Sequence, residues 1–175
     1  MKLISTIIIL ILNSADSTAQ NHSSKGTQQT LVKNIPSASF IPFKGGSADT
    51  LFGCLNSSSA TQPSDEDMYA PVILPTGSII TGINAHFWDW AFSNNVRPKL
   101  TLRRHDGKGE LVELAIAQSK LPNNGPTFYE QFSEIDPPYE LQQTDFLDLY
   151  FEVGEVVTLG YWICGVEIYY TNNTP

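Results

Sequence analysis

The sequence predicts an all-β fold, a single antiparallel β-sandwich of jelly-roll or Greek-key type with about nine strands. Three observations predict it. Apolar and polar residues alternate with a period of two through most of the chain after residue 34. Clusters of Gly, Pro, Asn and Asp interrupt this alternation at short intervals. No segment has a convincing 3.6-residue recurrence of an amphipathic helix. A closed lipocalin-like β-barrel is the alternative that the same pattern allows.

The first half of the domain is expected to hold four strands, over 39–43, 51–55, 68–74 and 78–90. Pro42 suits an edge strand, because proline cannot donate to a ladder of hydrogen bonds. The segment 56–67 is rich in Ser, Asp and Pro and is expected to be a loop. Pro75-Thr76-Gly77 is typical of a turn and separates the third strand from the fourth.

The second half is expected to hold further strands, over 99–104, 111–119, 127–135, 139–141, 145–153 and 161–171. Asp106-Gly107 favours a tight hairpin turn between the first two, since Asp-Gly readily adopts positive φ angles. Asp136-Pro137-Pro138 is expected to end the strand over 127–135.

The predicted core is formed by the apolar residues that share an inward parity on these strands. They are Phe52, Val72, Ile79, Ile83, Phe87, Leu100, Leu102, Val112, Leu114, Ile116, Leu147, Leu149, Phe151, Val166 and Ile168.

The N-terminal residues have the layout of a secretory signal peptide. Lys2 supplies the positive start, Leu3 to Leu12 is almost wholly apolar, and Ser17-Thr18-Ala19 fits a cleavage site. The apolar stretch is too short to span a bilayer. We therefore expect a signal peptide over 1–19, a flexible leader over 20–34 and the sandwich domain over 35–172. An uncleaved anchor or a buried strand is the alternative for 1–19.

This layout predicts a secreted protein, extracellular or periplasmic, with no transmembrane segment after signal cleavage. In such a compartment the two cysteines, Cys54 and Cys164, are expected to form a disulfide. Cys164 alternates with Val166 and Ile168, so the bridge is predicted to lie inside the sandwich. Two separate buried thiols are the alternative.

The net charge is −8 and the sequence has no basic stripe. This argues against nucleic acid and against anionic lipid surfaces as partners.

No motif in the sequence points to a reaction. There is no Gly-x-Ser-x-Gly and no phosphate-binding loop, and no two histidines share a short ligand spacing. Asp148 and Glu152 share a strand face, but residues four apart in a strand lie about 13 Å apart, too far for glycoside hydrolysis. The sequence therefore predicts no catalytic residue and no cofactor. A calcium site in the loop at Asp65-Glu66-Asp67 stays open.

One aromatic arrangement predicts a binding surface. His86, Trp88 and Trp90 share the strand face opposite Phe87, and Tyr169 has the outward parity of the last strand. Flat aromatic rings stack on sugars and on other apolar partners. We therefore expect these four residues to form a ligand-binding patch. The alternative is that a loop covers this face and the tryptophans belong to a core.

Residues 70–82 read APVILPTGSIITG, followed by an LTLRR strand from Leu100 and a terminal GVEIYY strand from Gly165. The chain here resembles a group of small secreted bacterial proteins, mostly uncharacterised, that share an APVxLPxGxxITG stretch and a terminal GVxIxY strand. The resemblance implies an exported β-sandwich and transfers no catalytic residue.

The sequence thus predicts a secreted non-catalytic protein with a binding, adhesive or structural role. Its partner is expected to be an extracellular protein, a glycan or a second copy of the chain. A carbohydrate-binding module that uses outward Trp residues is the alternative, and a glycan-active enzyme is the weaker one.

Overall fold

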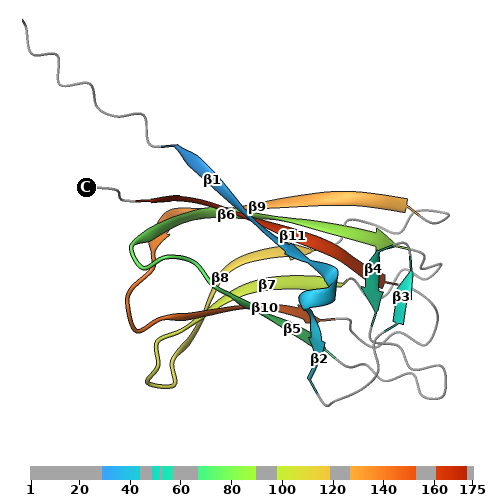
Figure 1. Cartoon of the computed structure of the whole chain (residues 1–175), viewed down its shortest axis with the longest axis horizontal. Helices are drawn as coiled ribbons and strands as arrows, with labels where there is room; N and C mark the ends of the chain where they lie inside the picture. Colours follow the sequence, from blue (N-terminus) through green and yellow to red (C-terminus); the bar gives the residue numbers. More distant parts are fainter. Residues whose placement is uncertain are drawn as a thin grey trace, which may run out of the picture.

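The computed structural model describes residues 29–43, 49–51, 53–56, 67–89, 98–118, 127–152 and 161–172. These residues form two antiparallel sheets that lie face to face (Figure 1). A single 3-10 turn, η1 (Ser37–Ser39), is the helical element among them. The all-β sandwich is confirmed. Within the same ranges, no helix has the length and apolar character needed to cross a bilayer.

The larger sheet, sheet A, has the order β3-β4-β11-β6-β9, and β1 also pairs with β11. Its strands are β1 (Thr30–Pro36), β3 (Asp49–Leu51), β4 (Cys54–Asn56), β6 (Ser78–Asp89), β9 (Thr127–Glu140) and β11 (Tyr161–Asn172). Sheet B has the order β2-β5-β10-β7-β8. Its strands are β2 (Ile41–Pro42), β5 (Met68–Val72), β7 (Lys99–His105), β8 (Leu111–Gln118) and β10 (Phe146–Glu152).

The connectivity is that of a jelly roll. The strands β4-β11-β6-β9 face β5-β10-β7-β8, and the chain changes sheet at each step except within the β3–β4 and β7–β8 pairs. The two sheets keep separate edges, so the closed barrel is not the fold of this chain. The edge position predicted for Pro42 is confirmed, because β2 lies at the edge of sheet B.

The core lies between the two sheets and is filled by large apolar side chains from both. Phe87 of β6 and Phe151 of β10 have ring centroids 6.1 Å apart, and both rings are buried. Ile83, Leu149 and Ile168 are also fully buried. Most of the predicted core residues that the structure describes lie here. Phe52 lies outside the described residues.

Two bulges overturn part of the predicted core. In β6 the pairing register shifts between Ile80 and Gly82, and Ile80, not Ile79, is fully buried. In β8 one extra residue lies opposite the Leu102–Arg103 step, so Ile116 is 43% exposed while Ala115 and Ala117 are buried. A bulge inserts one residue and reverses the side-chain parity beyond it, which a strict period of two does not predict.

Two predicted boundaries are also corrected. The leader expected over 20–34 ends earlier, because Thr30–Pro36 forms β1 and pairs with β11. The break expected at Asp136-Pro137-Pro138 lies within β9, which runs from Thr127 to Glu140. Residues 135–138 bulge out opposite a single residue of β6, and prolines are tolerated at such bulges. The predicted signal peptide lies outside the described residues.

Cys54 of β4 and Cys164 of β11 form the predicted disulfide. Its predicted place between the sheets is wrong. A bulge between Ile163 and Gly165 turns Cys164 out of the core, while Ile163 and Val166 both point inward. The bridge packs instead with Trp88 and Trp162 in a separate buried cluster.

Candidate functional site

The outer face of sheet A brings together residues from three strands. In the strand register, His86 of β6 lies opposite Glu130 of β9 and Gly165 of β11. Neighbouring positions on each strand face the core, so residues two apart share the outer face. The outward set is Asn84, His86, Trp88, Phe128, Glu130, Phe132, Trp162, Glu167 and Tyr169.

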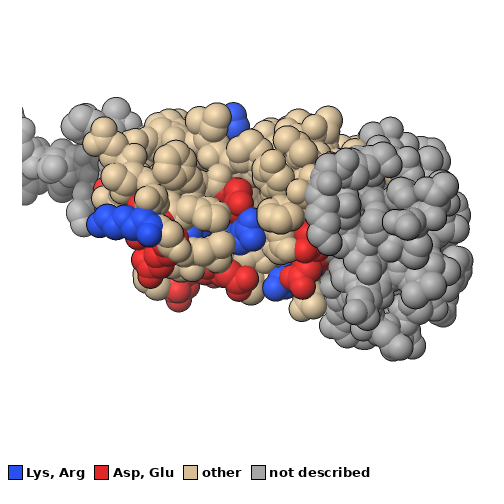
Figure 2. Space-filling view, turned by 90° about the horizontal axis from the view of Figure 1, so that it is seen from below, with Lys and Arg blue, Asp and Glu red and all other residues tan. Residues whose placement is uncertain are grey.

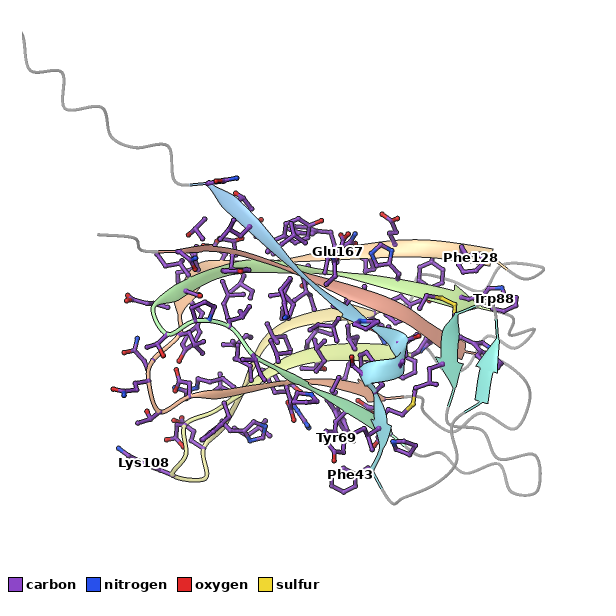
Figure 3. All side chains as sticks on the ribbon, in the orientation of Figure 1. Phe43, Tyr69, Trp88, Lys108, Phe128 and Glu167 are labelled. Atoms are coloured by element: carbon purple, nitrogen blue, oxygen red, sulfur yellow. A yellow bond between two sulfur atoms is a disulfide. The ribbon has the colours of Figure 1, made fainter. Side chains whose placement is uncertain are left out.

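The structure places His86, Trp88 and Tyr169 on this face, as the sequence predicts, and Trp90 lies outside the described residues. The expectation that Trp88 presents its indole at the surface is wrong, because Trp88 is only 5% exposed. The ring of Phe128 stacks on it with centroids 5.4 Å apart and planes 9° apart. Phe128 itself is 60% exposed, so it is the ring of this pair that reaches solvent (Figure 3).

A second exposed ring lies further along β9. Phe132 is 52% exposed and meets Tyr169 edge to face, with ring centroids 5.6 Å apart. Phe132 lies over Gly82, where a Cβ atom would come within 2.8 Å of its ring. Glycine at this position therefore lets the ring lie close against the sheet.

The sequence reasoning missed both phenylalanines. The segment 127–135 is aromatic, but its faces are unassigned without the pairing to β6. The alternation within this segment does predict that Phe128, Glu130 and Phe132 lie on one face of the strand.

A polar cluster lies between the exposed rings. His86 Nδ1 lies 3.5 Å from Glu130 Oε1, and His86 Nε2 lies 3.7 Å from Glu167 Oε2. Asn84 Nδ2 donates to both carboxylates, at 3.5 Å to Glu130 Oε2 and 3.2 Å to Glu167 Oε2. The Tyr169 hydroxyl also donates to Glu167 Oε2, at 2.8 Å.

These contacts hold Glu167 in its charged form. The hydrogen bond from Tyr169 and then that from Asn84 lower the pKa of the Glu167 carboxyl below its ordinary value, with a smaller contribution from His86. The same hydrogen bond raises the pKa of the Tyr169 phenol. Glu167 therefore presents a carboxylate, not a carboxylic acid, at neutral pH.

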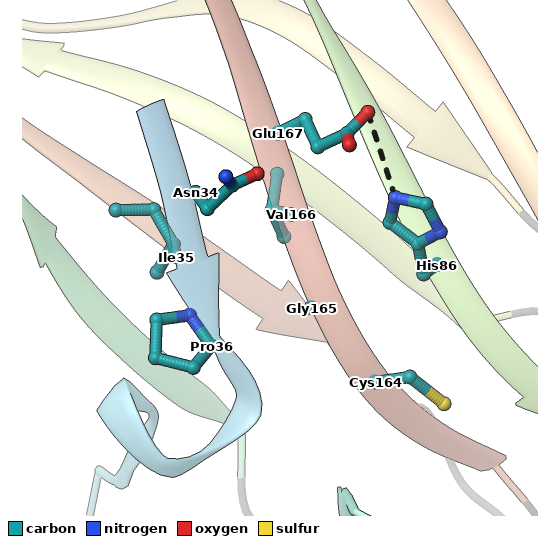
Figure 4. A pocket seen from close by; sticks show the side chains of 8 residues that line it. All are labelled: Asn34, Ile35, Pro36, His86, Cys164, Gly165, Val166 and Glu167. Carbon is teal, nitrogen blue, oxygen red and sulfur yellow. Dashed lines mark ion pairs between the residues drawn. The ribbon is translucent and has the colours of Figure 1, made fainter. Parts of the chain in front are cut away.

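A depression of about 400 Å³ opens beside this cluster, between β1, β11 and β6 (Figure 4). We call it the Gly165 depression. Its lining residues are Asn34, Ile35, Pro36, His86, Cys164, Gly165, Val166 and Glu167. The polar side chains of Asn34, His86 and Glu167 thus share the lining of this depression with apolar residues and with one half of the disulfide.

The described residues contain no group of three or more His, Cys, Asp or Glu side chains that could hold a metal ion. Of the acidic loop at 65–67, only Asp67 lies within the described residues. It accepts a hydrogen bond from the Tyr150 hydroxyl.

The outer face of sheet B has a different electrostatic character, with basic and acidic side chains intermixed (Figure 2). Arg103 donates twice to Asp148, at 2.9 and 2.7 Å, and its guanidinium lies 4.0 Å from the centre of the Tyr150 ring. Lys99 pairs with Glu152 at 2.9 Å. The acids here therefore have strong bases as neighbours.

Tyr150 gives this face a predicted response to alkaline pH. Partial burial and the hydrogen bond to Asp67 raise its pKa to about 12, against about 10 in an unfolded chain. The neutral phenol thus stabilises the fold fully below about pH 10, and this contribution is lost as the pH rises through about 12. Between about pH 10 and 12, the free energy of unfolding measured with urea should fall less steeply with pH in Tyr150→Phe than in the wild-type protein. An identical pH slope in both proteins would contradict the assignment.

Comparisons with known proteins give no family. No family model matches the sequence, and no curated protein matches it. The resemblance to small secreted bacterial proteins therefore stays a prediction.

Among solved structures, the chain is similar to the C-terminal CBM6 of LamC, a marine laminarinase from Zobellia galactanivorans. The identity is 14%, the match covers 79% of this chain and 98% of that one, and the TM-score is 0.39. It is also similar to part of a CocE/NonD family hydrolase from Staphylococcus aureus, at 10% identity and a TM-score of 0.36. That match covers 84% of this chain but 31% of the hydrolase. At such TM-scores the folds are only loosely alike.

Proposed function

We propose that the protein is a non-catalytic saccharide-binding protein and that the outer face of sheet A is its binding surface. One observation carries the proposal. Two exposed phenylalanine rings, Phe128 and Phe132, lie on the same face as a depression whose lining includes the polar side chains of Asn34, His86 and Glu167. Binding sites combine apolar and aromatic surface with a few placed polar groups, and this combination suits the C–H faces and hydroxyl groups of sugar rings.

The spacing of the rings favours an extended ligand. Phe128 and Phe132 lie four residues apart on β9, which corresponds to roughly 13 Å along the strand. Glu130 lies between them and is well exposed. A chain of several sugar units would therefore contact both rings and the polar cluster at once, while a single sugar would contact only part of the surface.

Three features support binding over glycoside hydrolysis. Hydrolysis uses one carboxyl group as a proton donor, with a raised pKa. Glu167 has a lowered pKa instead. Glu130 and Glu167 share the same Asn84 amide as a donor, and the Glu130 side chain is 66% exposed to solvent.

The disulfide supports a place outside the cytoplasm, since such bridges persist in oxidising compartments. Glycans of cell surfaces and matrices are found there. The proposal thus agrees with the secretion predicted from the N-terminal residues.

Calorimetric titration with a panel of oligosaccharides tests the proposal. Phe132→Ala should weaken binding roughly three- to tenfold, since an aromatic contact contributes about 0.5–1.5 kcal/mol. Phe146→Ala is the matched control, because Phe146 is 67% exposed on sheet B. Absence of binding to every oligosaccharide would refute the function. Equal weakening by both substitutions would refute the location.

Self-association is a second candidate, favoured by exposed apolar residues in and directly after the edge strand β2. Ile41 and Phe43 are exposed, and Phe43 meets Tyr69 edge to face with ring centroids 6.3 Å apart (Figure 3). Sedimentation velocity over a range of protein concentrations, without saccharide, separates the two functions. Concentration-dependent assembly would favour this second candidate, and a constant monomer would exclude it.

A further inference from the structure

We infer that the saccharide bound at the outer face of sheet A carries free amino groups, as oligomers of glucosamine do. This inference rests on the proposed function and specifies its ligand. The amino group would bind between Glu130 and Glu167, at the rim of the Gly165 depression.

The acidic residues on the two outer faces differ in their neighbours, and this difference indicates a cationic ligand. On sheet B, Asp148 and Glu152 pair with an arginine or lysine, at 2.7 and 2.9 Å, and Glu110 in the β7–β8 turn pairs with Arg104 at 3.0 Å. On sheet A, within the described ranges, Glu130 and Glu167 have only His86 within ion-pair distance. A histidine side chain does not carry the permanent positive charge of an arginine or a lysine. The two carboxylates therefore have no lysine or arginine partner among the described residues, and a ligand could supply the missing positive charge.

The contacts of Glu167 leave one of its carboxylate oxygens available to a ligand. Its contacts with Tyr169, Asn84 and His86 all go to Oε2. Among the described residues no hydrogen bond or ion pair involves Oε1, so this oxygen can accept from a ligand. A protonated amine has three N–H donors and no acceptor, and it would meet both Oε1 and the neighbouring Glu130 carboxylate.

The aromatic rings near Glu167 favour an amino sugar over a basic peptide as the ligand. The Tyr169 ring lies next to Glu167, and Phe132 packs edge-on against it. A flat ring beside a carboxylate suits a ligand whose ammonium group is attached directly to a ring with an apolar face. The lysine ammonium lies at the end of a flexible stem and gains less from such a surface.

Calorimetric titration with three tetrasaccharides near neutral pH tests the inference. They are the tetramers of glucosamine, of N-acetylglucosamine and of glucose. The acetylated tetramer is the matched probe, because acetylation removes the charge and keeps the sugar ring. We expect the glucosamine tetramer to bind at least about tenfold more tightly than either neutral one, as one charge-assisted hydrogen bond would give.

Glu167→Gln should reduce this preference to about twofold or less. Glu113→Gln is the control, since Glu113 is an exposed acid on β8 of sheet B. It should leave the preference unchanged. Thermal unfolding of each variant confirms that the fold is retained.

Other outcomes would contradict either the amino-sugar inference alone or the proposed saccharide binding as well. Equal affinity for the three tetramers would overturn the amino-sugar inference and leave saccharide binding in place. No binding to any oligosaccharide would overturn both. Lysine tetrapeptide bound as tightly as the glucosamine tetramer, with the same loss in Glu167→Gln, would overturn the choice of a sugar and indicate a basic peptide instead.

Discussion

Replacing both cysteines, as Cys54→Ser with Cys164→Ser, is expected to lower the free energy of unfolding by about 4–5 kcal/mol. The bridge closes a loop across a sequence separation of 110 and ties β4 to the bulge of β11. In the unfolded chain a loop of this length loses much conformational entropy when it is closed, and the double variant regains it. Urea denaturation followed by circular dichroism measures the loss.

Wild-type protein reduced with a phosphine serves as the control for the double variant, because it lacks the same bridge but keeps both sulfur atoms. It should lose a similar amount of stability. A loss below about 1 kcal/mol in both proteins would contradict a structural role for the bridge. Cys54 is almost fully buried, so a loss in the serine variant alone would indicate the cost of burying a hydroxyl group.

Phe87→Ala is expected to lower the free energy of unfolding by about 3–5 kcal/mol. The ring lies at the centre of the sandwich, where it stacks on Tyr129 at 5.3 Å and packs against Phe151. Truncation would remove apolar contacts from both sheets and leave a cavity that close-packed neighbours fill only in part. Chemical denaturation gives the difference.

The control for Phe87 is Phe146→Ala, which removes the same atoms from an exposed position on β10. It should change stability by less than about 0.5 kcal/mol. Similar losses at the two positions would show that residue 87 does not lie between the sheets.

Much of the fold could be predicted from the sequence because strand alternation is a local signal. Residues such as Leu100, Leu149 and Ile168 reach the core as their parity predicts. Ile79 and Ile116 do not, because each lies next to a bulge. A bulge depends on how the partner strand pairs, and this information lies far away in the sequence.

The candidate site could be predicted only in part, for a related reason. His86 and Tyr169 reach the outer face of sheet A as predicted. The burial of Trp88 depends in part on Phe128, which belongs to a strand roughly forty residues later in the chain and stacks on the indole. The cluster of Asn84, Glu130 and Glu167 likewise joins three strands, and no local pattern brings these residues together.

The proposed function requires that ligand binds on the outer face of sheet A. Amide chemical-shift mapping of ¹⁵N-labelled protein, titrated with the tightest-binding oligosaccharide, tests it most directly. We expect the shifts to concentrate around His86, Phe132 and Glu167, on β6, β9 and β11, while the amides near Arg103 and Tyr150 on sheet B stay unchanged. Shifts confined to sheet B would contradict it.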